Sequence, residues 1–405
     1  MRKDNKKKTI ILITVCLIVV FIFITLTKHN TTTINKSIDN EVDINDETKE
    51  VVADGIWEIS KYGNVKINVS HEKVLEAFEY GDILTVKFND TSVDVPLVQS
   101  FSEVDSGVAG LFLQMDNDVE ETELAINMGN FAENYLIANK IVHEDKSYEW
   151  QYCDGVSDST VFTITMKEKA GYLDQYIIRS MTFTNERDDY QDLTDEEFAN
   201  FRLVSAGEIS EGMLFRSSSP INPENGRNIY ADLAAKNAYV NVFVDLADNE
   251  DAIMEYEGVE NSYFITKNHI AVCASADFKS QETSTKLAEA FKYMANNPGI
   301  YCIFCDEGKD RSGIMIAILE SLMGASYDEI AKDYMLSFTN YYNIKENDKA
   351  YKVTLNGALN KTLMDIFGTD PETADLKAAA ENYLLSLGLD ESEISQLKDN
   401  LIMKE

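Results

Sequence analysis

The hydrophobic and polar positions divide the chain into three regions. Residues 9–27 contain no charged residue and are mostly Ile, Leu, Val and Phe, which is close to the ~20 apolar residues that cross a bilayer as one helix. Between residues 57 and 139, short stretches of alternating apolar and polar residues are typical of β-strands. From residue 201 onward, strand-like apolar stretches alternate with longer helical ones. The pattern predicts a transmembrane helix, a small all-β domain and an α/β domain, in that order.

The residues before the apolar stretch indicate its orientation. Residues 1–8 carry five basic side chains, and basic flanks stay on the cytoplasmic side of a membrane. We therefore expect a cytoplasmic tail at residues 1–8, a single-pass anchor in the cell membrane at residues 9–27 and a polar linker at residues 28–52. The rest of the chain would then be extracellular. The alternative is a cleaved signal peptide, which would have a shorter apolar core and a cleavage site of small residues.

The β-rich region shows its clearest alternation at residues 65–69, 83–88 and 93–95, with a turn at Asn89-Asp90. These strands predict a small barrel or sandwich. Two further strands are expected at residues 161–166 and 176–178. Thr194, with Glu197 three residues later, predicts the capped start of a short helix. We place the boundary near Asn185, so that a β-rich accessory domain covers residues 53–184 and an α/β domain covers residues 185–405.

The α/β region predicts a central, mostly parallel sheet flanked by helices. Strands are expected at residues 238–244 and 300–304. Helices are expected at residues 282–296, 314–323, 326–338, 374–386 and 392–402. Ser326, with Glu329 three residues later, is a typical helix start, and Pro298-Gly299 is a typical stop after the first of these helices.

Candidate chemistry lies in the nine residues from Cys305 to Gly313, which join a buried strand to a buried helix. Such loops at the carboxyl ends of parallel strands are where open α/β sheets bind ligands. Backbone N–H groups and the start of the helix can hold a phosphate dianion. Arg311 can add two parallel hydrogen bonds to phosphate oxygens. The same positive field favours the thiolate form of Cys305, which is the nucleophilic form.

Smaller residues of the loop have supporting roles in this interpretation. Ser312 can donate a hydrogen bond to the sulfur of Cys305 and ease its departure. Gly308 and Gly313 permit backbone geometry and close approach that a Cβ atom would hinder. Cys302 has two interpretations, either a small buried strand residue or a second thiol that protects Cys305 as a reversible disulfide.

Composition excludes several classes of function. The formal net charge of −34 argues against nucleic-acid binding, which needs a basic surface. The five cysteines are odd in number and irregularly spaced, and none of the four histidines has metal-ligand spacing. We therefore expect no disulfide framework, no metal site and no cofactor.

The loop resembles the Cys-x5-Arg-[Ser/Thr] signature of cysteine-dependent protein tyrosine phosphatases. Its Gly-Lys-Asp-Arg stretch, residues 308–311, is similar to a bacterial tyrosine-phosphatase family whose members also act on phosphoinositides. The family usually has His before the nucleophile, where this chain has Phe304. Further stretches also resemble the family: Asn200-Phe201-Arg202, residues 214–220 around Arg216, Val244-Asp245-Leu246, residues 323–326 and residues 333–337.

The resemblance implies a cysteine-phosphatase fold and a set of roles. Cys305 would attack phosphorus to form a phosphocysteine intermediate, and Arg311 would hold the phosphoryl oxygens. The general acid would be Asp310 within the loop or Asp245 at the end of a neighbouring strand. Lys309 would lie at the pocket mouth and could bind additional phosphates. The expected substrate-binding residues are Asp306, Glu307, Gly308, Lys309, Ser312 and Gly313.

A weaker resemblance covers the β-rich region. The stretches Lys61-Tyr62-Gly63-Asn64, Gly81-Asp82 and 125–130 are similar to the carboxyl-terminal β-domain of S-adenosylmethionine hydroxide adenosyltransferases. In those enzymes a second, preceding domain completes the nucleoside site. In this chain the apolar stretch takes that place, which favours an accessory or binding module over a transferase.

The leading hypothesis is a membrane-anchored phosphatase that hydrolyses phosphotyrosine, a phosphate monoester, on the outer face of a bacterial cell. The first alternative is a phosphoinositide or inositol-phosphate phosphatase. The second is a surface-binding protein with a vestigial phosphatase domain, against which the intact Cys305, Arg311 and Ser312 argue. A rhodanese-like sulfur carrier also uses a cysteine loop, but the Arg311-Ser312 ending fits phosphate better. The expected partners are the phosphorylated substrate and the membrane, and not nucleic acid.

Overall fold

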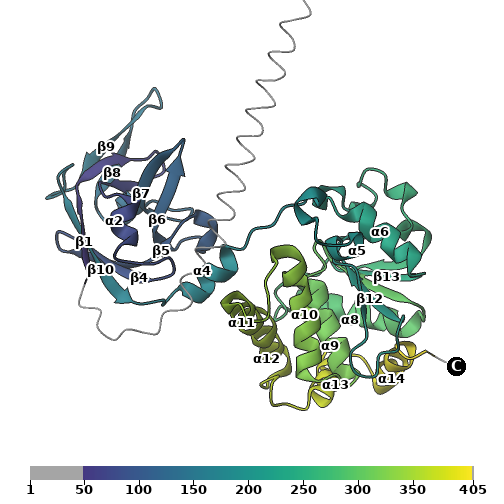
Figure 1. Ribbon diagram of the computed structural model, residues 1–405. Helices are drawn as coiled ribbons and strands as arrows, with labels where there is room; N and C mark the ends of the chain where they lie inside the picture. Colours follow the sequence, from purple (N-terminus) through teal and green to yellow (C-terminus); the bar gives the residue numbers. More distant parts are fainter. Residues whose placement is uncertain (1–48, 404–405) are drawn as a thin grey trace, which may run out of the picture. The chain divides into compact units, whose positions relative to one another are not determined.

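The computed structural model describes residues 49–403 (Figure 1). Contacts divide this part of the chain into two compact units, the first formed by residues 49–99 and 106–169 and the second by residues 100–105 and 170–403. The predicted tail, the predicted anchor at residues 9–27 and most of the predicted linker lie outside the described residues. Within residues 49–403, no helix is both long enough and apolar enough to cross a membrane.

The first unit is built on an eight-stranded sheet with the order β1-β10-β4-β5-β6-β7-β3-β2. Neighbouring strands pair antiparallel except β5 and β6, which pair parallel. The strands are β1 (Glu50–Asp54), β2 (Ile56–Ile59), β3 (Val65–Ile67), β4 (Ile83–Phe88), β5 (Thr91–Val98), β6 (Ala109–Asp116), β7 (Val119–Ile126) and β10 (Val161–Glu168). A separate two-stranded sheet consists of β8 (Ala138–Val142) and β9 (Tyr148–Tyr152).

The alternation in the sequence accounts for the core of this unit. In β4, Leu84, Val86 and Phe88 are buried, and the residues between them are more exposed, as expected when side chains alternate between two faces. The strands predicted at residues 65–69, 83–88, 93–95 and 161–166 are confirmed as β3, β4, β5 and β10. The turn between β4 and β5 contains Asn89 with a φ of 46°, a backbone conformation that Asn tolerates better than most residues. Two short helices, α2 (His71–Leu75) and α3 (Phe131–Asn134), belong to the same unit.

The second unit is built on a five-stranded sheet with the order β11-β12-β15-β13-β14. The strands are β11 (Arg202–Val204), β12 (Leu214–Ser217), β13 (Val242–Asp245), β14 (Asn268–Ala271) and β15 (Tyr301–Phe304). All pairs are parallel except β11 with β12. The predicted mostly parallel sheet is therefore confirmed, and β15 is its central strand.

Helices cover both faces of this sheet (Figure 1). The longer ones are α6 (Asn228–Asn237), α8 (Gln281–Asn296), α9 (Arg311–Leu322), α10 (Tyr327–Tyr342), α13 (Leu376–Ser386) and α14 (Glu391–Asn400); the shorter ones are α5 (Asp195–Phe198), α7 (Glu250–Ile253), α11 (Lys349–Thr354) and α12 (Lys361–Phe367). Helix α9 is buried from Ser312 to Leu322 because it contacts β15, α10 and α13. This explains why its sequence is apolar on nearly every side.

One predicted strand is wrong. Residues 176–178 belong to α4 (Leu173–Arg179), which contacts α11 of the second unit. Both sides of β10 are already paired, with β1 and β4, so the sheet has no place for another strand beside it. The spacing of Leu173, Tyr176 and Ile177 suits one face of a helix. By its contacts the first unit ends at Lys169, so the predicted boundary near Asn185 lies within the second unit.

Candidate active site

The predicted phosphate-binding loop runs from the end of β15 to the start of α9, in the middle of the sheet edge. Cys305 is buried, and its Sγ atom lies 3.5 Å from Oγ of Ser312. A pocket of about 320 Å³ opens at this point. It is lined by Ala274, Ser275, Ala276, Cys305, Asp306, Glu307, Asp310 and Arg311. The fold thus brings the predicted nucleophile, the predicted phosphate-binding arginine and one predicted general acid to a single cavity.

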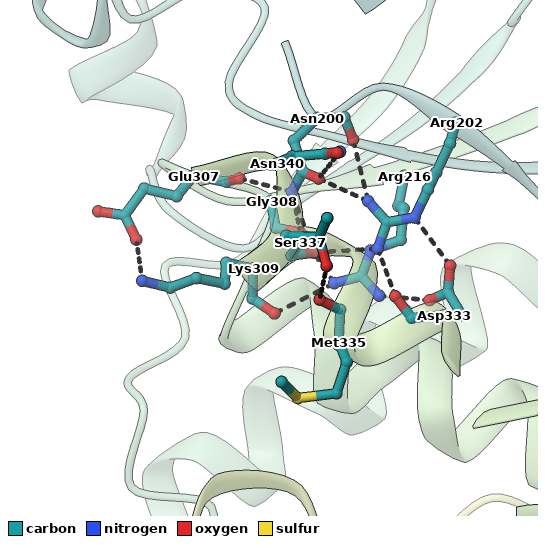
Figure 2. Close-up of polar contacts among 11 residues, drawn as sticks. Asn200, Arg202, Arg216, Glu307, Gly308, Lys309, Asp333, Met335, Ser337 and Asn340 are labelled. Carbon is teal, nitrogen blue, oxygen red and sulfur yellow. Dashed lines mark hydrogen bonds and ion pairs between the residues drawn. The ribbon is translucent and has the colours of Figure 1, made fainter. Parts of the chain in front are cut away.

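The carbonyl groups of the loop accept hydrogen bonds from side chains outside it (Figure 2). Nδ2 of Asn200 donates to the carbonyl oxygens of Glu307 and Gly308, both at 3.0 Å. Nη2 of Arg216 donates to those of Gly308 at 2.8 Å and Lys309 at 3.1 Å. Tyr341 donates through its hydroxyl to Glu307 at 3.0 Å. Among the described residues, the N–H groups of residues 306–310 have no hydrogen-bond acceptor. They are therefore available to a bound anion.

A buried ion-pair network supports these donors (Figure 2). Nε of Arg202 lies 2.8 Å from Oδ1 of Asp333, and Nη1 of Arg216 contacts Oδ2 of the same carboxylate. Burial raises the pKa of Asp333, but the charges of Arg202 and Arg216 outweigh this effect and lower it overall. Arg202 also donates to Oδ1 of Asn200 at 2.6 Å. The network therefore fixes Asn200 and Arg216, two of the side chains that hold the loop carbonyls.

Asn200, Arg216 and Asp333 lie in stretches that resemble the family, but the sequence alone assigns them no role. The sequence does contain a hint of such a role, because a buried arginine or asparagine in an apolar stretch needs a polar partner. The loop carbonyls that Asn200 and Arg216 contact lie more than 90 positions away along the chain, as does Asp333 from Arg216. No local pattern could have paired them.

Steric contacts explain why glycine is required at both Gly308 and Gly313. Gly308 has a φ of 65°, and a Cβ atom there would lie 2.0 Å from the carbonyl oxygen of Ser217. A Cβ atom on Gly313 would lie 2.8 Å from Nη2 of Arg216 and from the ring of Tyr334. Gly308 thus allows the loop to approach β12, and Gly313 leaves space for Arg216 beneath the loop.

Arg311 is held at the pocket by three groups. Nη1 donates to the carbonyl oxygens of Leu246 at 3.0 Å and Ala274 at 3.4 Å, and Nη2 contacts the carboxylate of Asp306. Burial lowers the pKa of Arg311, but the charges of Cys305 and Asp306 outweigh it and raise the pKa overall. The guanidinium therefore interacts electrostatically with Cys305, the predicted nucleophile. A phosphate bound by Arg311 would compete with Asp306 for Nη2.

The expectation that Lys309 lies at the pocket mouth is wrong. Its side chain is buried, and Nζ contacts the hydroxyl of Tyr342 at 2.8 Å and Oε2 of Glu307 at 3.1 Å. Nζ also lies 5.4 Å from the ring centre of Phe338 and 5.0 Å from that of Tyr342. Ion pairing and cation–π contacts hold the ammonium group there. Lys309 does not line the pocket.

The two candidate acids occupy different environments. Asp310 lines the pocket with a side chain that is 51% exposed, 3.6 Å from Nζ of Lys309. Asp245 is fully buried, and its Oδ1 accepts hydrogen bonds from the N–H groups of Ala247 at 2.7 Å and Asp248 at 3.1 Å. Burial and the charge of Asp248 raise the pKa of Asp245 to about 8. The Asp245 carboxyl is therefore mostly protonated at neutral pH and braces the turn after β13.

Asp248 is a further acidic residue that sequence reasoning missed. It is buried near the pocket and accepts a hydrogen bond from the hydroxyl of Tyr256 at 2.9 Å. Burial raises its pKa, the charge of Asp306 adds to this effect, and the charge of Arg311 opposes it. The residues Ala274, Ser275 and Ala276, which follow β14, were also missed because small residues carry no chemical signal.

Cys302 and Phe304 lie on the opposite face of the sheet from Cys305. Cys305 packs in the same core cluster as Ile303, whereas Cys302 packs with Phe304 in another. Residues three apart on a strand point to opposite faces. The alternative that Cys302 protects Cys305 as a disulfide is therefore wrong, and burial raises the pKa of the Cys302 thiol. Phe304, which stands where the related family has His, packs edge-on against Phe264.

The buried thiol, the arginine and the loop N–H groups lie together at one edge of the parallel sheet, an arrangement that can bind a phosphate group. The chain belongs to the tyrosine phosphatase family, whose model matches residues 197–403. It is therefore a phosphatase, a hydrolase of phosphate esters. The C-terminal domain of S-adenosylmethionine hydroxide adenosyltransferases matches residues 55–140, in agreement with the weaker resemblance of the β-rich region.

Several solved structures are similar to this chain. The core catalytic domain of the PP-IP phosphatase SIW14 from S. cerevisiae, in complex with citrate, is 20% identical over 39% of this chain and 92% of that one, with a TM-score of 0.26. P. aeruginosa TpbA in complex with pTyr is 15% identical over 45% and 96%, with a TM-score of 0.26. An uncharacterized conserved protein from Thermotoga maritima is 16% identical over 28% of this chain and 35% of that one, with a TM-score of 0.21. No curated protein matches the chain.

Proposed function

We propose that the protein hydrolyses phosphotyrosine in proteins through a phosphocysteine intermediate. The observation that carries the proposal is the pocket in which Cys305 and Arg311 meet a loop whose N–H groups have no acceptor among the described residues. Such a set of N–H groups and a guanidinium can stabilise the equatorial oxygens of a phosphoryl group during its transfer. The choice of phosphotyrosine rests on membership of the tyrosine phosphatase family.

The reaction would proceed in two steps. The Cys305 thiolate attacks phosphorus, so that a P–S bond forms while the bond to the leaving oxygen breaks, and Asp310 gives its proton to that oxygen. Water then attacks phosphorus, the P–S bond breaks and Asp310 takes the proton from water, which releases inorganic phosphate. Ser312, with its hydroxyl 3.5 Å from the sulfur, stabilises the departing thiolate. Most of the catalysis comes from positioning and charge stabilisation.

We also propose that the enzyme acts from the outer face of the cell membrane. The support is the uncharged apolar stretch at residues 9–27, preceded by five basic residues. The substrate would then be an extracellular or foreign phosphoprotein. The alternative substrates, phosphoinositides or inositol phosphates, lose their main physical support, because Lys309 is engaged by Glu307 and Tyr342.

Phosphate release by the purified full-length protein tests the proposed activity. The substrates are a phosphotyrosine peptide, a phosphoserine peptide and phosphoinositide vesicles, with a chelator and a thiol reductant present. We expect release from the phosphotyrosine peptide, and we expect the chelator to have no effect. Release from phosphoinositides alone would favour the first alternative. If the folded, reduced protein releases phosphate from none of these substrates, the proposed activity is contradicted. That result would favour the second alternative, a surface-binding protein with a vestigial phosphatase domain.

The Asp310→Asn variant tests the assignment of the general acid. We expect its kcat for the phosphotyrosine peptide to fall by about 10²–10³-fold, a typical loss for a positioned acid. The loss should be smaller for an aryl phosphate with a good leaving group, because that oxygen needs less protonation. Asp245→Asn is the matched comparison, and it should retain kcat because Asp245 does not line the pocket. If the losses fall on Asp245→Asn instead, the assignment is reversed.

A further inference from the structure

The wall of the active-site pocket is acidic. Four of the residues that line it are charged, and three of these are the carboxylates of Asp306, Glu307 and Asp310, while Arg311 is the fourth. The side chains of Asp306 and Glu307 are 46% and 32% exposed, and that of Asp310 is about half exposed. These carboxylates therefore face the solvent from which a substrate must enter.

The nearest additional cation of the loop is not available to the substrate. Lys309 keeps only 7% of its surface exposed, and its ammonium group already contacts Glu307, Asp310 and Tyr342. Burial lowers the pKa of Lys309, but the charges of Asp310 and Glu307 outweigh it and raise the pKa. A second phosphate on the substrate could reach this ammonium group only by displacing Glu307 and the aromatic rings around it.

Two more carboxyl groups, those of Asp245 and Asp248, interact electrostatically with Asp306. Burial raises the pKa of Asp245 and of Asp248, and the charge of Asp306 adds to the effect in both. Asp306 is therefore close enough to both for their charges to interact. Oδ2 of each residue is buried and has no hydrogen-bond partner among the described residues. Among the described residues that line the pocket, Arg311 is the basic one, and its Nη2 contacts the carboxylate of Asp306.

The phosphate itself is accommodated by Arg311 and the loop N–H groups, but every further charge of the substrate meets this acidic wall. A second phosphate would be repelled, whereas an ammonium or guanidinium group beside the scissile phosphate would be attracted. We propose that the pocket selects phosphopeptides with Lys or Arg next to the phosphorylated residue. This inference rests on the proposed phosphatase function and names its substrate class.

The test uses the purified full-length protein and three phosphotyrosine peptides that differ only in their flanking residues, which are Arg, Ala or Glu. At about 50 mM salt, we expect kcat/KM for the Arg-flanked peptide to exceed that for the Glu-flanked peptide by about 10-fold or more. At about 500 mM salt the ratio should shrink severalfold, because salt screens charges at the surface of the pocket. An inositol polyphosphate should be hydrolysed more slowly than any of the peptides.

Two variants localise the effect to the pocket wall. Asp306→Asn and Glu307→Gln should each lower the ratio of Arg-flanked to Glu-flanked kcat/KM by about 3-fold. The ratio is taken within each variant, so that a change in intrinsic activity cancels. The control is Glu391→Gln, which removes an exposed carboxylate from the first turn of α14 and should leave the ratio unchanged.

The outcomes separate this inference from the proposed function. If the protein hydrolyses a simple aryl phosphate and all three peptides at equal rates, or prefers the Glu-flanked peptide or the inositol polyphosphate, the charge selectivity is overturned and the phosphatase function stands. If the reduced, folded protein hydrolyses neither the peptides nor the aryl phosphate, the proposed function itself fails. If Glu391→Gln lowers the ratio as much as the pocket variants do, the preference comes from net charge and not from the pocket.

Discussion

Replacing Cys305 with serine should abolish phosphatase activity, with kcat lower by about 10⁴-fold or more, the size of loss typical of a removed nucleophile. The reason is chemical, because a serine hydroxyl is not ionised at neutral pH and is a poor nucleophile in a site built for a thiolate. The change is small in volume, so the fold should remain. Phosphate release from the phosphotyrosine peptide, measured in the presence of reductant, checks this prediction.

The matched control is Cys302→Ser. Cys302 lies only three positions away and is equally buried, but it packs on the other face of the sheet. We expect this variant to keep kcat within about 3-fold and to lose about 1 kcal/mol of unfolding free energy. A Cys305→Ser protein that keeps a tenth of the activity would contradict the nucleophile assignment. Equal losses in both variants would indicate damage to the strand instead.

The second large effect is expected from Asp333→Asn. This carboxylate is the counter-charge of two buried arginines, Arg202 and Arg216. Removing one partner of a buried ion pair leaves uncompensated charge in the interior and typically costs about 3–5 kcal/mol. The free energy of unfolding of the second unit should fall by this amount. Since Arg216 also holds the carbonyl groups of Gly308 and Lys309, kcat should fall as well.

Urea unfolding followed by two probes provides an internal control. Both tryptophans, Trp57 and Trp150, lie in the first unit, whereas most helical residues lie in the second. The transition in circular dichroism at the helical band should shift to lower urea, and the transition in tryptophan fluorescence should not. The control variant is Asp328→Asn, at an exposed position in the first turn of α10, the helix that contains Asp333. It should change the free energy of unfolding by no more than about 0.5 kcal/mol. An unchanged circular-dichroism transition for Asp333→Asn would show that the network contributes no net stability.

Local patterns in the sequence predicted many of the elements correctly. The helix starts at Thr194 and Ser326 are capping boxes in the structure, as predicted, because a capping box depends only on side chains and N–H groups within one turn. The strand at residues 301–304 and the helix after it were readable because burial on all sides requires apolar residues throughout. The strand predicted at residues 176–178 was wrong because the local pattern there suits a strand or a helix equally well. The sheet excludes a strand beside β10, whose two sides are paired with β1 and β4.

In the active site, too, local features could be predicted from the sequence, whereas contacts with distant segments could not. The positions of Cys305 and Arg311 at one pocket followed from the strand–loop–helix pattern, since one short loop carries both residues. The opposite orientation of Cys302 also follows from the alternation of side chains along a strand. The environment of Lys309 could not be predicted in this way. Its contacts with Phe338 and Tyr342 come from α10, a separate helix.

The sequence by itself predicted most of the elements, the phosphate-binding loop and Cys305 as the proposed nucleophile, because each depends on residues that are neighbours along the chain. Only the tertiary structure decided which side chains support that loop and which charges reach the pocket. Asn200, Arg216 and Asp333 come from distant segments that the parallel sheet and α10 bring together. The carboxylates of the pocket wall belong to the loop itself, but it is α10 that supplies the rings around the ammonium group of Lys309. Charge interactions and hydrogen bonds depend on distance in space and not on distance along the chain. Their effects on substrate choice can therefore be inferred only from the folded structure.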